Sequence, residues 1–101
     1  MAVVLDPEGE ELRVLIEFLD APSSQRVLEI GAGDGRLTFR YADQVAHVTA
    51  IDPDEDDIGL AKERLPKELK EKVDFQAIGI EAYSLPTGLP AFDTVLLSWS
   101  L

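Results

Sequence analysis

The sequence predicts an α/β fold, a three-layer sandwich whose central sheet has about four parallel strands. Two observations carry this prediction. Short apolar segments rich in β-branched residues alternate with longer segments of helical periodicity. Glycine, proline, serine or aspartate bounds the apolar segments, as is typical of buried strands. Strands that alternate with helices pair in parallel through right-handed crossovers, so we expect one domain over residues 1–101.

The predicted elements follow one another along the chain. An N-terminal helix over residues 6–20 begins at a capping Asp6 and at Pro7, and its leucines recur at helical spacing. The remaining elements form a core over residues 26–101. Strands are predicted at 26–30, 47–52, 73–78 and 92–101, and helices between them at 36–45 and 53–65.

The fourth predicted strand is the last element of the chain. Neither a helix nor a further strand follows it, and a bare hydrophobic edge is a liability for a sheet. We therefore expect an incomplete domain: a truncated chain, a fragment, or a chain that completes its sheet with a partner. The expected result is pairing through residues 94–99, as a homo-oligomer or with another protein.

The composition disfavours several classes of function. The chain has 20 acidic and 9 basic residues and a net charge of −11, which disfavours nucleic acid and anionic membranes as partners. It has no cysteine, so disulfides, thiolate zinc sites and a cysteine nucleophile are excluded. We expect no metal site. The N-terminus lacks the features of a signal peptide and no segment reaches the length of a membrane span, so we expect a cytoplasmic protein.

The first predicted strand leads into VLEIGAGDGR, residues 27–36, in which Gly31, Gly33 and Gly35 stand at alternate positions. Glycine permits positive φ and lets a ligand lie against bare backbone. Between a first strand and a helix, such a loop lies at the edge where α/β sheets bind ligands. The alternative is that the glycines only make a tight turn.

Two features of this loop disfavour a dinucleotide. The motif G-x-G-x-x-G has its third glycine one position later, where this chain has Arg36. Asp34 brings a carboxylate to the helix N-terminus, where a pyrophosphate needs N–H donors, although Asp34 could also be a plain helix cap. No Gly-Lys-Ser/Thr follows, which excludes a P-loop. The loop therefore favours a nucleoside ligand without phosphates.

The segment VLEIGAGDGRLT resembles the first motif of the class I S-adenosylmethionine-dependent methyltransferases, an acidic residue followed by G-x-G-x-G. The resemblance covers residues 27–101. It implies a Rossmann-like fold with strand order 3-2-1-4, truncated relative to the seven-stranded methyltransferase fold. It also implies S-adenosylmethionine as the cofactor, and transfer of its methyl group to an acceptor that the sequence does not identify.

The resemblance also implies roles for the residues of the first motif. Gly31, Gly33 and Gly35 would lie against the methionine part and the ribose of the cofactor. Glu29 would lie near the cofactor ammonium, directly or through water, because a carboxylate at the ligand end of a strand attracts a cation. The alternative for Glu29 is a solvent-facing strand residue.

Asp52 closes the second predicted strand. Its carboxylate can accept two hydrogen bonds from vicinal ribose hydroxyls, as an acidic residue does in dinucleotide sites. The resemblance implies this task for Asp52 and places Ile51 and Pro53 beside the adenine, which requires the Asp52 carboxylate to face the three glycines. The alternative is an Asp-Pro turn that starts the next helix.

The later segments match the family less well. After the third strand the family has Gly-Asp, whereas this chain has Gly79, Ile80 and Glu81. Either Glu81 or the backbone would bond the adenine amino group, with Ile80 lining the pocket, and Glu81 could equally be a solvated loop acid. Ser98 at the ligand end of the fourth strand is a further candidate contact to the cofactor. Trp99 either covers a methyl acceptor or belongs to the core.

No residue is identified as a catalytic base, because the single histidine, His47, opens the second strand at the end opposite the ligand. Methyl transfer from a sulfonium mainly needs positioning of donor and acceptor. The first hypothesis is the cofactor-binding part of a methyltransferase, an enzyme only if the missing C-terminal part is supplied. The alternative is a non-catalytic module that binds S-adenosylmethionine or assembles with a partner. Arg36 and Asp34 disfavour a nicotinamide oxidoreductase.

Overall fold

A computed structural model of the chain describes residues 2–5, 22–83 and 92–98. The predicted N-terminal helix over residues 6–20 lies outside these described residues, and so does Trp99. The other predicted elements fall within them, wholly or in part.

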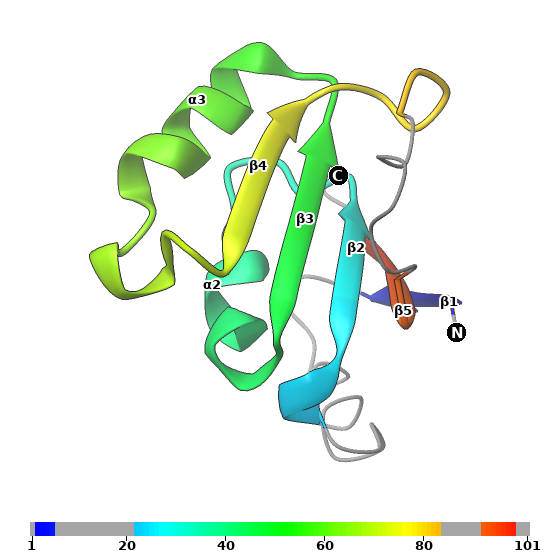
Figure 1. The fold of residues 1–101 in the computed structure, drawn as a ribbon. Coiled ribbons are helices and arrows are strands. Elements are labelled where there is room, and N and C mark those ends of the chain that lie inside the picture. The colour runs from blue at the N-terminus through cyan, green and yellow to red at the C-terminus, as the bar shows by residue number, and fades with distance from the viewer. Residues whose placement is uncertain (1, 6–21, 84–91, 99–101) are drawn as a thin grey trace.

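The described strands are β1 (Ala2–Leu5), β2 (Arg26–Ile30), β3 (His47–Asp52), β4 (Val73–Ala77) and β5 (Thr94–Ser98). They form one parallel sheet in the order β1-β5-β2-β3-β4 (Figure 1). The four strands predicted from the sequence therefore lie in the order 3-2-1-4, and the Rossmann-like arrangement is confirmed.

The expectation of a bare edge at residues 94–99 is wrong, because β1 covers the outer edge of β5. The two strands run parallel, with Ala2 opposite Val95 at the start of the register. Residues 2–5 read AVVL, an apolar segment whose β-branched valines suit a strand. The sequence pattern missed this strand because it is short and its partner lies at the opposite end of the chain. The edge at which an oligomer or a partner is expected is thus occupied by the chain's own residues.

The helix predicted at 36–45 is shorter than expected. It consists of α2 (Thr38–Tyr41) and a 3-10 turn, η2 (Ala42–Gln44). Leu37 stands at the N-cap of α2 and provides no side-chain cap. Threonine, phenylalanine and tyrosine are also weak helix formers, which explains the short helix. Two further 3-10 turns are η1 (Pro22–Ser24) and η3 (Lys67–Leu69).

The helix predicted at 53–65 is confirmed as α3 (Glu55–Arg64). Asp54 caps it, because its Oδ1 accepts hydrogen bonds from the backbone N–H groups of Asp56 and Asp57, both at 3.0 Å. Acidic residues fill the first turn and basic residues the last, as the helix dipole favours. Among the helices in the described part of the chain, none has the length and apolar character that crossing a bilayer requires.

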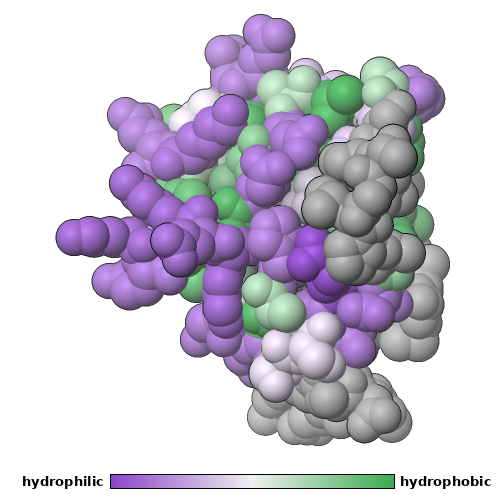
Figure 2. Space-filling view, viewed as in Figure 1, coloured by the Kyte–Doolittle hydropathy of each residue, from purple (hydrophilic) through white to green (hydrophobic). Residues whose placement is uncertain are grey.

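The two described α-helices lie on the same face of the sheet, because β2, β3 and β4 follow one another across it in one direction (Figure 1). The core lies between these helices and the sheet, and the outer side of α3 is hydrophilic (Figure 2). The larger core side chains are Val27, Leu37, Tyr41, Val45, Val48, Ile58, Leu69, Val73, Phe75 and Leu96.

Candidate functional site

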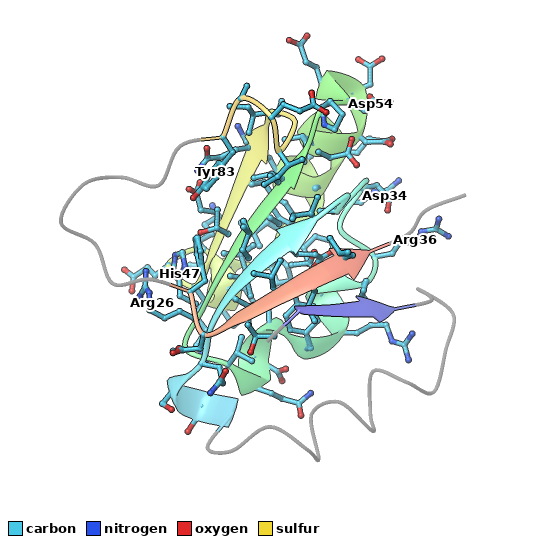
Figure 3. All side chains as sticks on the ribbon, turned by 90° about the vertical axis from the view of Figure 1, so that its right-hand side faces the viewer. Arg26, Asp34, Arg36, His47, Asp54 and Tyr83 are labelled. Carbon is cyan, nitrogen blue, oxygen red and sulfur yellow. The ribbon has the colours of Figure 1, made fainter. Side chains whose placement is uncertain are left out.

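The carboxyl ends of the strands form the edge at which a ligand site is expected. The chain passes from β2 through β3 to β4 on one side, and returns to the other side of β2 with β5. This reversal beside β2 is the switch point at which α/β sheets bind ligands. The glycine loop, residues 31–37, follows β2 at this point. Figure 3 shows Asp34 and Asp54 at the end to which the strand arrows point, and Arg26 and His47 at the other end.

All three glycines of the glycine loop have positive φ: 82° at Gly31, 58° at Gly33 and 87° at Gly35. Residues with a side chain rarely adopt these angles, so the backbone of the loop requires its alternate glycines. The N–H groups of Gly31 and Ala32 both donate to the carbonyl oxygen of Ile51, at 2.9 and 3.0 Å. The loop is therefore fastened to the end of β3.

Gly35 also has a packing role. A Cβ placed on Gly35 would lie 3.0 Å from a ring carbon of Phe39 and 3.1 Å from a ring carbon of Phe75, closer than carbon atoms normally pack. The two rings meet edge to face, with 5.8 Å between their centroids. The missing side chain of Gly35 therefore makes room for the protein's own aromatic residues. Its contact with a ligand stays a prediction.

Asp52 is the carboxylate that the structure brings to the glycine loop. Its Oδ2 accepts the N–H of Gly33 at 3.0 Å, and its Oδ1 accepts the N–H of Asp54 at 2.8 Å. The residue is 9% exposed, so the carboxylate is largely shielded from solvent while it faces the glycines. The requirement that Asp52 faces the loop is met. The bond to Asp54 shows that Asp52 also shapes the turn into α3.

Glu29, one residue before the end of β2, has no exposed surface. Its Oε1 accepts hydrogen bonds from the Thr38 hydroxyl at 2.8 Å and from the Tyr41 hydroxyl at 2.6 Å. Burial and the adjacent Glu29 carboxylate raise the pKa of the Tyr41 phenol well above its ordinary value. The alternative of a solvent-facing side chain is therefore wrong. The position of Glu29 near the cofactor ammonium, directly or through water, stays a prediction.

Asp34 does not cap α2, so that alternative is wrong. Its Oδ1 accepts the backbone N–H of Arg36 at 3.3 Å and pairs with the Arg36 Nε at the same distance. Its Oδ2 pairs with the Arg64 guanidinium, in the last turn of α3, at 3.4 Å. Both arginine side chains are well exposed, so these ion pairs contribute little stability. Asp34 instead connects the glycine loop to α3.

Carboxylates gather where α3 begins beside the glycine loop. The pKa of Asp57 is raised by partial desolvation and by the carboxylates of Asp54, Asp52 and Asp34. Within the described ranges, no three acidic or histidine side chains come together as ligands for a metal ion. The negative field at this edge therefore favours a cationic ligand and disfavours a phosphate.

The remaining predicted site residues lie on other segments at the same edge. Pro53 follows β3 and is exposed, as are Ile80 and Glu81 in the turn after β4. A Cβ placed on Gly79 would lie 3.9 Å from the Cβ of Pro53, so these two segments are neighbours. Ser98 is the last residue of β5. The exposed proline and isoleucine give the edge an apolar surface.

At the opposite end of the sheet, the amino end of its strands, Arg26 and Asp93 are hydrogen-bonded to each other. The Arg26 N–H donates to Oδ2 of Asp93, and the Asp93 N–H donates to the Arg26 carbonyl oxygen, both at 2.8 Å. His47 lies at this end, as the sequence predicts. Burial and Arg26 lower the pKa of His47, although Asp74 acts in the opposite direction. His47 is therefore remote from the glycine loop.

Sequence reasoning missed Thr38 and Tyr41 as members of this site. Hydroxyl side chains on a short amphipathic helix carry no signal of their own. The sequence feature that could have revealed them is Glu29, because an acid inside the apolar strand RVLEI needs hydrogen-bond donors once it is buried. The hydroxyl groups of the following helix are candidates for these donors.

Comparisons with known proteins agree with this geometry. The family described as "Methyltransferase domain" matches residues 27–101. The chain is 38% identical over 53 residues to the ribosomal RNA small subunit methyltransferase A of Salinibacter ruber, covering 52% of this chain and 18% of that protein. It is 32% identical over 89 residues to the demethylmenaquinone methyltransferase of Renibacterium salmoninarum, covering 88% of this chain and 35% of that protein.

Two solved structures are similar as well. The YcgJ protein of Bacillus subtilis aligns with a TM-score of 0.68 and 27% identity, covering 85% of this chain and 36% of that chain. The plantazolicin methyltransferase BpumL, in complex with SAH, aligns with a TM-score of 0.59 and 25% identity, covering 72% of this chain and 26% of that chain. These matches confirm the resemblance found in the first motif. The chain spans about a third or less of the length of the curated relatives it matches.

Proposed function

Because this chain belongs to the methyltransferase domain family, we propose that it binds S-adenosylmethionine at the carboxyl edge of its sheet. The observation that carries the proposal is the hydrogen bond of 3.0 Å from the Gly33 N–H to Oδ2 of Asp52. It holds the acid that closes β3 against the backbone of the glycine loop, as a site shared by one nucleoside requires. We further propose that the chain supplies the cofactor-binding part of a methyltransferase.

The groups at this edge fit a nucleoside that has a positive charge and no phosphate. Asp52 accepts two N–H groups, and a carboxylate has further lone pairs with which to accept two ribose hydroxyls. The carboxylates of Asp54 and Asp57 attract a cation and repel a phosphate. These hydrogen-bond acceptors and negative charges suit S-adenosylmethionine better than a dinucleotide.

The residues proposed to hold S-adenosylmethionine come from four segments that meet at the edge. The backbone of the glycine loop would lie along the ligand, Asp52 would hold the ribose, and Pro53 and Ile80 would flank the adenine. Glu29 is included for its predicted position near the cofactor ammonium, directly or through water, and its carboxylate is held by Thr38 and Tyr41. The full proposed set is Glu29, Gly31, Gly33, Gly35, Asp52, Pro53, Ile80, Glu81 and Ser98.

The contribution of these residues to methyl transfer is positioning. When bound, S-adenosylmethionine supplies a methyl group on a sulfonium, whose thioether is already a good leaving group. The glycine loop and Asp52 hold the nucleoside in one place, which reduces the entropy lost when donor and acceptor meet. His47 lies at the opposite end of the sheet, so we assign it no proton transfer at this site.

The class of methyl acceptor is a separate part of the proposal. The two named relatives act, by name, on ribosomal RNA and on demethylmenaquinone, so kinship leaves the acceptor open. The net charge of −11 repels a polyanion. We therefore favour an acceptor without a phosphate backbone. Filter binding to RNA at low salt tests this preference, and tight retention would contradict it.

The alternative function, a module that completes its sheet with a partner through the β5 edge, is no longer supported, because β1 pairs with that edge.

A cytoplasmic location remains part of the proposal. Fractionation of cells that express the tagged chain tests it.

Titration calorimetry tests the proposed function. The chain, shown to be folded by circular dichroism, is titrated with S-adenosylmethionine, S-adenosylhomocysteine and NADH. We expect one site for each of the two sulfur compounds and no heat with NADH. Asp52→Ala should weaken both sulfur compounds at least about tenfold, because it removes a charged hydrogen-bond acceptor. Asp43→Ala, an exposed acid on η2, is the matched control and should leave the Kd unchanged. No heat with either sulfur compound from a folded chain contradicts the proposal.

A further inference from the structure

We propose that Thr38 and Tyr41 are positioning residues of the ligand site, and that they act through Glu29 to hold the glycine loop in its binding conformation. The inference rests on the proposed function, because the glycine loop is part of the proposed binding site for S-adenosylmethionine. Thr38 and Tyr41 are 0% and 1% exposed, so they act through other residues and not by touching the ligand.

The hydrogen bonds to Glu29 bracket the glycine loop. Glu29 lies just before the loop on β2, and Thr38 and Tyr41 lie directly after it on α2. A single carboxylate oxygen accepts both hydroxyl groups, at 2.8 Å from Thr38 and 2.6 Å from Tyr41. The strand before the loop is thereby joined to the helix after it. The two ends of residues 31–37 are fixed relative to one another.

The segment needs such a connection because its local structure is weak. Three glycines with positive φ lose much conformational freedom when the loop becomes ordered. The helix that follows has four residues and no side-chain cap, and a helix this short is not stable by itself. Tertiary contacts must therefore hold α2, and with it the far end of the loop.

Core packing alone would not require a polar contact at this place. Removing a carboxylate from water is costly, and apolar side chains of similar size would fill the same space without that cost. Hydrogen bonds from hydroxyl groups to a carboxylate are directional, so they fix where the end of β2 lies relative to α2. The raised pKa of Tyr41 keeps its hydroxyl protonated, and therefore a donor, at neutral pH.

The competing explanation is that the charge of Glu29 contacts the cofactor ammonium. That explanation requires the negative charge and gives Thr38 and Tyr41 no part in binding. The positioning role requires the reverse: an acceptor for two hydroxyl groups is needed, and the charge is not. The complete burial of Glu29 favours the positioning role.

Substitutions at these residues separate the two explanations. Glu29→Gln keeps an oxygen that accepts both hydroxyl groups and removes the charge, whereas Glu29→Leu removes both. Tyr41→Phe and Thr38→Val each delete one donor and keep an apolar side chain in the core. For each folded variant, calorimetry gives the Kd of S-adenosylhomocysteine, and ¹H–¹⁵N spectra report the amides of the loop glycines.

The expected results differ between the variants. The Kd of Glu29→Gln for S-adenosylhomocysteine should lie within about threefold of that of the unaltered chain. The Kd of Tyr41→Phe should be about tenfold higher, the effect of one lost hydrogen bond. The amide resonances of Gly31, Gly33 and Gly35 should shift in Tyr41→Phe and keep their positions in Glu29→Gln. Thr38→Val should resemble Tyr41→Phe.

Val73→Ala is the matched control, because Val73 is buried at the amino end of β4. It should lower the Tm and leave both the Kd and the glycine resonances unchanged. The inference is overturned if Glu29→Gln loses binding as fully as Glu29→Leu, or if Tyr41→Phe and Thr38→Val both keep the original Kd. If Glu29→Leu does not fold, the other three variants still decide. An unaltered chain that binds no S-adenosylhomocysteine contradicts the proposed function instead.

Discussion

The two ends of the sheet use their carboxylates in different ways. At the amino end, the Asp93 carboxylate accepts the backbone N–H of Arg26 and the Asp93 N–H donates to the Arg26 carbonyl oxygen, both at 2.8 Å, which connects the neighbouring strands β2 and β5. At the carboxyl end, Asp52 and Glu29 hold the glycine loop and α2 instead of another strand. Among the described residues, the glycines with positive φ all lie at this second end.

This difference indicates which end is organised around a ligand. Contacts between neighbouring strands complete the sheet and need nothing further. Carboxylates that hold a glycine backbone in an uncommon conformation keep N–H groups and bare Cα atoms available at a fixed place. Substitutions at the carboxyl end should therefore change both stability and binding, whereas those at the amino end should change stability alone.

Gly35→Ala should have the largest effect on stability. Its φ of +87° disfavours any side chain, and the added methyl group would meet Phe39 and Phe75. We expect the free energy of unfolding to fall by about 2–4 kcal/mol, from the left-handed backbone and the overpacking together. Urea denaturation measures this change.

The control for Gly35→Ala is Gly59→Ala on α3, where an added Cβ meets nothing within 4 Å. Alanine is the better helix former, so this variant should gain up to about 1 kcal/mol. Equal stability of the two variants would contradict the packing role of Gly35.

Asp52→Asn and Asp93→Asn compare the two ends directly. In Asp52→Asn, the N–H of either Gly33 or Asp54 would face an amide nitrogen in place of a carboxylate oxygen. We therefore expect the free energy of unfolding to fall by about 1–3 kcal/mol. The bond from Arg26 to Asp93 is exposed, so Asp93→Asn should lose less stability. Calorimetry with S-adenosylhomocysteine should show weaker binding for Asp52→Asn alone. Equal effects of the two variants on the Kd would break the comparison.

His47 should make the stability of the folded chain decrease in acid. Burial and Arg26 lower its pKa in the folded chain, so the unfolded chain takes up the proton first, near 6.5. This contribution to stability is fully present above pH 6.5 and is lost as the pH falls toward the lowered pKa. The Tm of His47→Asn should therefore improve relative to the unaltered chain as the pH falls from about 7.5 to about 5.5. A constant difference would contradict the lowered pKa, and the Kd should not change.

Asp57→Asn should have the smallest effect. The pKa of Asp57 is raised by partial desolvation and by the carboxylates of Asp54 and Asp52, so its charge costs stability once the pH exceeds that pKa. We expect a small rise in Tm at neutral pH that shrinks as salt is added, because salt screens the repulsion. A fall in Tm would mean that attraction to the helix dipole is the larger effect.

Local patterns were enough to predict much of the carboxyl end. Alternate glycines behind an apolar strand predicted the loop at Gly31, Gly33 and Gly35, and all three have positive φ. The resemblance of the first motif to the methyltransferases implied that Asp52, at the end of the next strand, faces this loop, and the structure shows that it does. Both predictions succeed because the ends of adjacent parallel strands meet at one edge.

Predictions that depended on a single residue in isolation were less successful. Asp34 resembled a helix cap, but it bonds Arg36 and pairs with Arg64 on another helix. The solvent-facing alternative for Glu29 is wrong, because its carboxylate is buried against two hydroxyl groups of α2. In each case the deciding partner lies at a distance that the local pattern does not specify.

The sequence by itself determined that parallel strands alternate with helices and that a glycine loop follows the first of the four predicted strands. These features follow from periodicity, from the φ angles that glycine permits and from the rules of parallel sheets. The strand order 3-2-1-4 and the requirement that Asp52 faces the loop came from the resemblance of the first motif to the methyltransferases. The tertiary structure alone decided that β1 pairs with β5, that Gly35 makes room for two aromatic rings, and that Glu29 is held by Thr38 and Tyr41. Such contacts join segments whose mutual approach depends on how the whole chain packs, and no local pattern records that approach.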